Sequence, residues 1–159
     1  MPKVLARGFA ALTTLAAFAA ASPALGGPAT PIPFAAPLEE TCKPEDPCGT
    51  ISFQLDKKPK NERKVHDIEI TDMAAACEGR KGRLKFSIYG YAKVLDDRSF
   101  AVRSEDGEGA KAVVRGQFSR KFRRAKGTVR LWGMFDLDDG AGRSKCESGK
   151  QKFTATISG

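Results

Sequence analysis

Histidine is scarce in this sequence, because the 159 residues contain only one, His66. A nucleophile, histidine and carboxylate triad would have to use it, and neither Ser52 nor Ser87 lies in a Gly-x-Ser-x-Gly turn. His66 stands beside Asp67 and is predicted to be a half-exposed strand residue. The sequence therefore predicts no enzyme and no catalytic residue. A secreted hydrolase with a site that sequence does not reveal is the alternative.

Patterns that bind metals are also missing. The four cysteines form neither a CxxC pair nor a cluster with histidine, so we expect no zinc site. The spacing of an EF-hand calcium loop is matched only in part, at positions 1, 3 and 12, by Asp136, Asp138 and Glu147. Gly140 stands where that loop needs an oxygen ligand, and Ala141 stands where it needs a glycine for the turn. We predict no metal and no cofactor. The other grouped carboxylates lack a partner acid for a glycosidase pair and are predicted to be turn residues: Asp96, Asp97, Glu105, Asp106 and Glu108.

No stretch after Gly49 keeps helical spacing over three turns. Short alternating runs separated by polar turns predict a single all-β domain, a sandwich or small barrel of about seven to eight mostly antiparallel strands. The segment 71–76 fits either one helical turn or an irregular strand. A hairpin is expected around a turn at residues 96–98. The predicted core positions are Ile51, Phe53, Leu55, Ile68, Ile70, Leu84, Phe86, Ile88, Ala92, Val94, Phe100, Val102, Phe153, Ala155 and Ile157.

The longest apolar run, residues 8–21, is too short to span a bilayer. Lys3 and Arg7 precede it and small residues follow it, so residues 1–24 are predicted to be a signal peptide. We therefore expect a secreted or extracytoplasmic protein without a transmembrane segment. Residues 25–41, rich in proline, alanine and glycine, are predicted to be an extended tether, and residues 42–159 the β domain.

Four cysteines in an exported chain of this size predict two disulfides, for which three pairings exist. Cys42 with Cys48 and Cys77 with Cys146 are favoured. The first pair closes a short ring that prolines already restrict, and the second joins the middle of the domain to its last hairpin. In the loop-entropy model the long bridge stabilises the fold by about 4 kcal/mol and the short one by about 2 kcal/mol.

Positive charge exceeds negative charge. The chain has 27 basic and 19 acidic residues, and loss of Lys3 and Arg7 leaves 25 basic residues and a formal charge of +6. A surplus of this size serves either solubility or the binding of a polyanion.

The central part of the domain, residues 112–134, alternates in two runs that predict a hairpin, and Gly127 is expected to let the chain turn back. The loop between the runs concentrates cations, which favours an anionic partner. Phe122 in this loop would either stack on a sugar or base or anchor the loop. A second basic run, residues 57–64, is expected to assist. The candidate binding residues are Arg120, Lys121, Phe122, Arg123, Arg124 and Lys126.

Several turn and packing residues occur together in a fixed order: Cys77 and Gly79; Gly116, Gln117 and Phe118; residues 124–128; Cys146, Glu147, Ser148 and Gly149; then Phe153 and Ala155. In this respect the chain resembles a group of small exported, uncharacterised all-β proteins of high-GC Gram-positive bacteria. The resemblance covers residues 49–157. It implies the fold, export and the Cys77 to Cys146 pairing, and no catalytic residue.

These observations predict an exported, non-enzymatic β domain that binds an anionic surface or polymer. The expected partner is an anionic cell-envelope polymer or a lipid surface, and nucleic acid is not expected.

Overall fold

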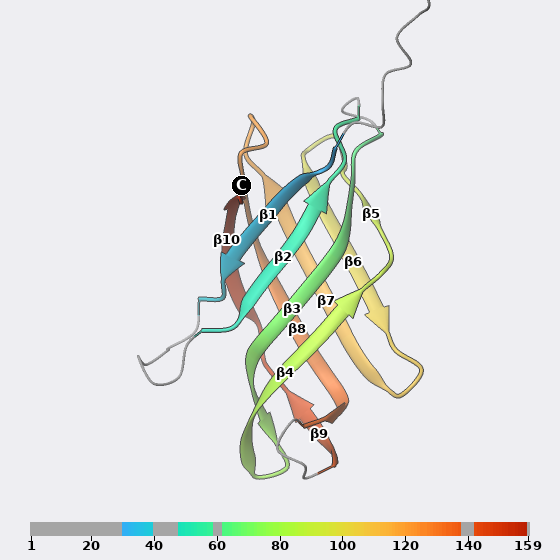
Figure 1. Cartoon of the computed structure of the whole chain (residues 1–159), viewed down its shortest axis with the longest axis vertical. Helices are drawn as coiled ribbons and strands as arrows, with labels where there is room; N and C mark the ends of the chain where they lie inside the picture. Colours follow the sequence, from blue (N-terminus) through green and yellow to red (C-terminus); the bar gives the residue numbers. More distant parts are fainter. Residues whose placement is uncertain (1–29, 40–47, 59–61, 138–141, 159) are drawn as a thin grey trace, which may run out of the picture.

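The computed structural model describes residues 30–39, 48–58, 62–137 and 142–158. These residues form ten β-strands and no α-helix (Figure 1). The strands are β1 (Ile32–Pro37), β2 (Thr50–Leu55), β3 (Lys64–Cys77), β4 (Arg80–Ile88), β5 (Ala92–Lys93), β6 (Ser99–Glu105), β7 (Ala110–Phe118), β8 (Arg124–Asp136), β9 (Arg143–Glu147) and β10 (Gln151–Ile157).

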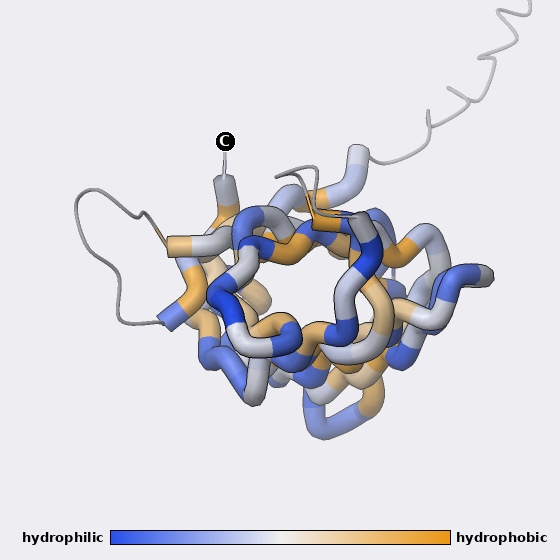
Figure 2. Tube along the Cα trace, turned by 90° about the horizontal axis from the view of Figure 1, so that it is seen from below, coloured by the Kyte–Doolittle hydropathy of each residue, from blue (hydrophilic) through white to orange (hydrophobic). Residues whose placement is uncertain are grey.

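All ten strands belong to one antiparallel sheet that closes on itself. Its order is β10-β1-β2-β3-β9-β8-β7-β6, and β10 also pairs with β8, so six strands form a closed cycle. Strands β4 and β5 are added at β3, whereas β7 and β6 continue from β8. Seen end-on, the chain runs around a ring (Figure 2). The all-β prediction is confirmed, and the arrangement is a barrel rather than a sandwich, with more strands than the seven or eight expected.

Strand β1 lies where the sequence predicted a tether. Residues 32–37 pair with β2 along their whole length and with β10 at Phe34 and Ala35, and Phe34 is buried. Pro33 and Pro37 face β10, where their missing N–H groups leave the ladder short, although the Pro33 carbonyl still accepts from the Ser158 N–H at 3.1 Å. The tether prediction is therefore wrong for these residues, and the domain begins before residue 42. The predicted signal peptide lies outside the described residues.

Strand β3 resolves the ambiguous segment 71–76, which is extended. Two β-bulges interrupt the strand, one at Asp67 and one at Asp72, where φ is 49° and 54°. Each bulge inserts one extra residue between inward-facing positions, so the strand buries Val65, Ile68, Ile70, Met73, Ala75 and Cys77. Of the two alternatives for this segment, the irregular strand is therefore confirmed, and the bulge accounts for its interrupted alternation.

The hairpin expected around residues 96–98 is only partly correct. The turn forms, because the Ser99 N–H and hydroxyl both donate to Asp97 Oδ1, at 2.9 and 2.6 Å. However, β5 pairs with β3, and β6 pairs with β7. Among the predicted core positions, Val102 is only partly buried and Ile157 is exposed, whereas the others are buried. The next predicted turn is also formed, with Asp106 Oδ1 accepting from the N–H groups of Glu108 and Ala110.

The central hairpin is confirmed, since β7 and β8 pair continuously from Ala110 opposite Gly133 to Phe118 opposite Ala125. Gly127 does not make the turn, which corrects the prediction. It lies inside β8 opposite Gly116, and a Cβ atom on it would clash with the Arg115 carbonyl oxygen and come within 2.5 Å of the Phe153 ring. Its missing side chain therefore makes room for the neighbouring β7 backbone and for Phe153.

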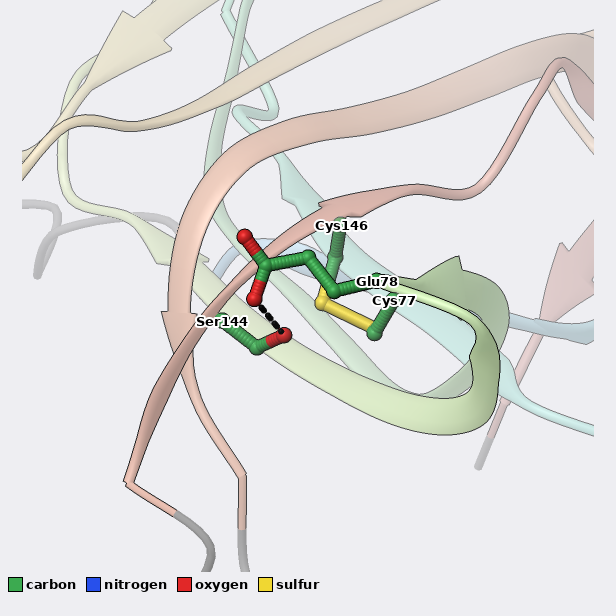
Figure 3. Close-up of a disulfide and its surroundings, with 4 residues drawn as sticks. All are labelled: Cys77, Glu78, Ser144 and Cys146. Atoms are coloured by element: carbon green, nitrogen blue, oxygen red, sulfur yellow. Dashed lines mark hydrogen bonds between the residues drawn. A yellow bond between two sulfur atoms is a disulfide. The ribbon is translucent and has the colours of Figure 1, made fainter.

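The Cys77–Cys146 disulfide is present, as predicted, and joins β3 to β9 at the end of the sheet opposite the β7–β8 loop. Both cysteines are buried. Beside the bridge, the buried Ser144 hydroxyl donates to the Glu78 carboxylate at 3.0 Å (Figure 3). Cys48 is also disulfide-bonded. Cys42 lies outside the described residues, so its pairing with Cys48 stays a prediction.

Candidate functional site

The basic loop between β7 and β8 has a defined conformation. The Phe122 N–H donates to the Ser119 carbonyl at 2.9 Å, and the Ser119 N–H donates to the Arg124 carbonyl at 2.8 Å. Phe122 adopts a left-handed φ of 53°, which turns the chain back into β8. Arg120, Lys121 and Arg123 are exposed around this turn.

Phe122 fixes the loop to the barrel. Its ring centre lies 5.4 Å from that of Phe118, which belongs to a buried cluster of phenylalanines. The Arg63 guanidinium carbon lies 4.0 Å from the centre of the Phe122 ring. The ring is half-buried and contacts Phe118 and Arg63. Of the two roles that the sequence left open for Phe122, these contacts favour the anchor.

Arg63 brings the two basic runs together. Its Nε donates to the carbonyl of Lys58 at 3.1 Å, while its guanidinium covers Phe122 of the other run. Between the runs lies an open groove of about 530 Å³, in which five of the ten lining residues are Lys or Arg and one is acidic. We call it the basic groove. It is lined by Ile32, Leu55, Asp56, Lys57, Arg63, Arg120, Lys121, Phe122, Arg123 and Ile157.

A second depression, of about 390 Å³, adjoins the same loop. It is lined by Ser119, Arg120, Lys121, Arg123, Arg124 and Thr156. Loop cations therefore border both depressions. Lys126, another predicted binding residue, lies within β8 opposite Gln117 and Thr154, is exposed, and lines neither depression.

The predicted binding cations have no ion-pair partner in the part of the chain that the structure describes. None of Arg120, Lys121, Arg123, Arg124 and Lys126 forms an ion pair there. The acidic lining residue of the basic groove, Asp56, is engaged by His66 instead. The groove therefore presents a net positive field to solvent.

His66 lies between two carboxylates. Its Nε2 is 3.0 Å from Asp56 Oδ1, and its Nδ1 is 3.0 Å from Asp67 Oδ2. The side chain is 23% exposed and belongs to β3, which confirms the prediction of a half-exposed strand residue. A general base needs a ring nitrogen that faces a nucleophile. Both nitrogens face carboxylates here, and His66 does not line the basic groove.

Carboxylates of the weak calcium pattern are paired with arginine. Both Glu147 carboxylate oxygens accept hydrogen bonds from Arg130, at 2.9 and 2.8 Å, and this interaction is the main cause that lowers the pKa of Glu147. Asp136 lies 3.9 Å from Arg143, and Asp138 lies outside the described residues. The described residues contain no cluster of three or more His, Cys, Asp or Glu side chains that could hold a metal ion.

Sequence reasoning found the loop cations but missed two features of the site. One is the contact of Arg63 with Phe122, since residues 59 positions apart give no local signal of proximity. The other is the apolar part of the groove lining, which Ile32, Leu55 and Ile157 supply from the ends of three strands. Both depend on closure of the sheet.

Comparisons of the chain with protein family models, with curated proteins and with solved structures gave no match. The resemblance to exported Gram-positive proteins therefore stays a prediction. No helix in the described ranges is long and apolar enough to cross a membrane. The Cys77–Cys146 disulfide is compatible with an extracytoplasmic location, where disulfides persist.

Proposed function

We propose that this protein is an exported, non-enzymatic binding domain, and that the basic groove is its contact surface for an anionic polymer or surface. The observation that carries the proposal is the contact of Arg63 with Phe122. This contact joins two basic runs, far apart in the sequence, around one open groove.

Electrostatics support the proposal. Five cations line a groove in which Asp56 is the acidic residue, and one oxygen of that carboxylate is hydrogen-bonded to His66. Phosphate, sulfate or carboxylate groups that repeat along a partner would engage several of these cations at once. Each contact would release a counterion, so affinity should fall steeply with salt concentration.

The non-enzymatic part of the proposal is supported by the position of His66. Its ring nitrogens face Asp56 and Asp67, so the arrangement resembles a structural charge cluster more than a triad. Export is supported by the sequence of residues 1–24, and the disulfide is compatible with it.

The test is retention on a heparin column over a salt gradient. A variant with Arg120, Lys121, Arg123 and Arg124 changed to glutamine should elute at clearly lower salt than the parent. The matched control removes the same charge from exposed strand positions outside the groove, through K81Q, R103Q, K145Q and K152Q. We expect the control to elute closer to the parent.

Both variants should melt at the parent's temperature, because exposed cations contribute about 0.5 kcal/mol or less to folding. Co-elution of the loop variant with the parent would exclude the groove as the binding surface. Failure of the parent to bind heparin and anionic vesicles at low salt would refute the function itself.

A further inference from the structure

Large apolar side chains are exposed in the segment that connects β4 to β6. Tyr89 is 91% exposed, Tyr91 64% and Leu95 55%. They include both tyrosines of the chain. Single exposed apolar residues are ordinary, but three within seven residues mark a candidate contact site. We call these three residues the aromatic rim.

The local backbone explains why the rim faces outward. From residue 91 to 95 the chain alternates, with Ala92 and Val94 buried and Tyr91, Lys93 and Leu95 exposed. The buried residues hold the segment against β3, and alternation then places the other three on the outer face. A cation therefore stands between two of the exposed apolar side chains.

The aromatic rim is continuous with the basic groove. The Val94 N–H donates to the Arg63 carbonyl at 2.9 Å, and Lys64 Nζ lies 3.8 Å from the centre of the Tyr91 ring. Thus Arg63 covers Phe122 in the groove, while its neighbour Lys64 covers Tyr91 in the rim.

A second connection joins the rim to the β7–β8 loop. Arg98 lies in the turn that follows Leu95, and its carbonyl accepts from the Phe118 N–H at 3.0 Å while its Nε donates to the Phe118 carbonyl at 3.2 Å. The start of β3, the turn before β6 and the β7–β8 loop lie at the same end of the barrel, the upper end in Figure 1.

Resting on the function proposed above, we infer that the anionic partner is the surface of a bilayer that contains anionic phospholipids. Tyrosine and leucine beside lysine and arginine suit the interface between membrane and water, where rings lie at headgroup depth and cations meet anionic headgroups. A dissolved polyanion would engage the cations but would gain nothing from an exposed Leu95. The basic groove faces the headgroups, and the aromatic rim inserts beside it.

The inference is tested by sedimentation with vesicles of phosphatidylcholine, with and without phosphatidylglycerol. The parent should bind only the anionic vesicles and should bind them less at high salt. The rim variant Y89S/Y91S/L95S should lose at least tenfold in affinity for these vesicles, yet elute from heparin with the parent. M134S removes an exposed apolar side chain elsewhere and is the matched control, expected to bind as the parent does.

A spectroscopic readout reports insertion directly. In a W132F background, which removes the native tryptophan, L95W should shift its emission to shorter wavelength on anionic vesicles and should be quenched by brominated lipid. An unshifted spectrum on vesicles that bind the protein would contradict insertion.

The outcomes separate the two proposals. Binding to heparin without binding to anionic vesicles would overturn the bilayer as partner and leave the proposed function standing, with a dissolved polymer as ligand. Equal vesicle affinity of rim variant and parent would also overturn the inference. If the parent bound neither heparin nor anionic vesicles, the proposed function and the inference would both be overturned.

Discussion

Replacement of Phe122 tests the link between the fold and the site. F122A removes the ring that packs against Phe118 and supports the guanidinium of Arg63. Loss of a fully buried phenylalanine costs about 3–5 kcal/mol. Phe122 is half-buried, so we expect a loss of about 2 kcal/mol in the free energy of unfolding.

The glycine variant separates packing from backbone strain. F122G loses the same contacts, but glycine adopts the left-handed φ of 53° without a steric cost. Alanine at this φ costs about 1 kcal/mol more. Relief of this strain favours F122G over F122A by about 1 kcal/mol. The greater conformational entropy of glycine in the unfolded chain reduces this advantage in part, so F122G should still be the more stable of the two.

Urea unfolding of the parent, F122A and F122G measures these differences, and heparin elution measures the effect on the groove. We expect both variants to elute at lower salt, because Arg63 loses the ring that holds it beside the loop. If F122A were as stable as the parent, Phe122 would not be an anchor. If F122G were clearly less stable than F122A, the argument from backbone conformation would be refuted.

Three further predictions concern stability away from the groove. Changing Cys77 and Cys146 to alanine should cost about 4 kcal/mol in urea unfolding, because the bridge spans 69 positions of chain, and an unchanged midpoint would contradict this. E147Q should slightly lower the free energy of unfolding at neutral pH. Arg130 lowers the pKa of Glu147 in the folded protein, so the stabilisation from this pair is fully present above the pKa that Glu147 has in the unfolded chain. It is lost as pH falls through the lower pKa of the folded state. The free energies of unfolding of parent and variant should therefore become equal in acid. G127A should cost about 1–3 kcal/mol, measured by thermal melting, because its Cβ atom would clash with the Arg115 carbonyl oxygen and the Phe153 ring; a variant as stable as the parent would contradict this close packing.

Regular alternation made most of the barrel predictable. Ile51, Phe53 and Leu55 are buried along β2, as their spacing indicated. Alternation did not predict the strands where local residue preferences disagree with the tertiary structure. Pro33 and Pro37 favour a tether, yet Phe34 and Ala36 between them are buried, and that burial stabilises β1 in the sheet. In β3 the bulges at Asp67 and Asp72 shift the alternation, which a fixed period of two cannot follow.

The candidate site was predictable in its charge but not in its shape. Runs of cations are visible in any sequence, so the β7–β8 loop could be selected directly. The sequence predicts the turn at Gly127 because glycine usually supplies a positive φ. In the structure Phe122 adopts the positive φ of this turn. Its contacts with Phe118 and Arg63 stabilise a conformation that local propensity disfavours. Arg63 is 59 positions away in the sequence, so its part in this compensation leaves no local trace.

The two ends of the barrel have different chemistry, and this difference makes the proposals testable. Strand β3 begins at Lys64, directly after Arg63 of the basic groove, and ends with Cys77 of the disulfide at the other end of the barrel. At the disulfide end, Cys77 and Cys146 are buried and Ser144 bonds to Glu78, so substitutions there act on folding. At the groove end Arg120, Lys121, Arg123 and the aromatic rim are exposed, so substitution of these residues removes little buried surface. Variants of the exposed loop cations and of the rim should therefore change binding while the melting temperature stays near that of the parent, and a large fall in that temperature would show that these residues serve the fold instead.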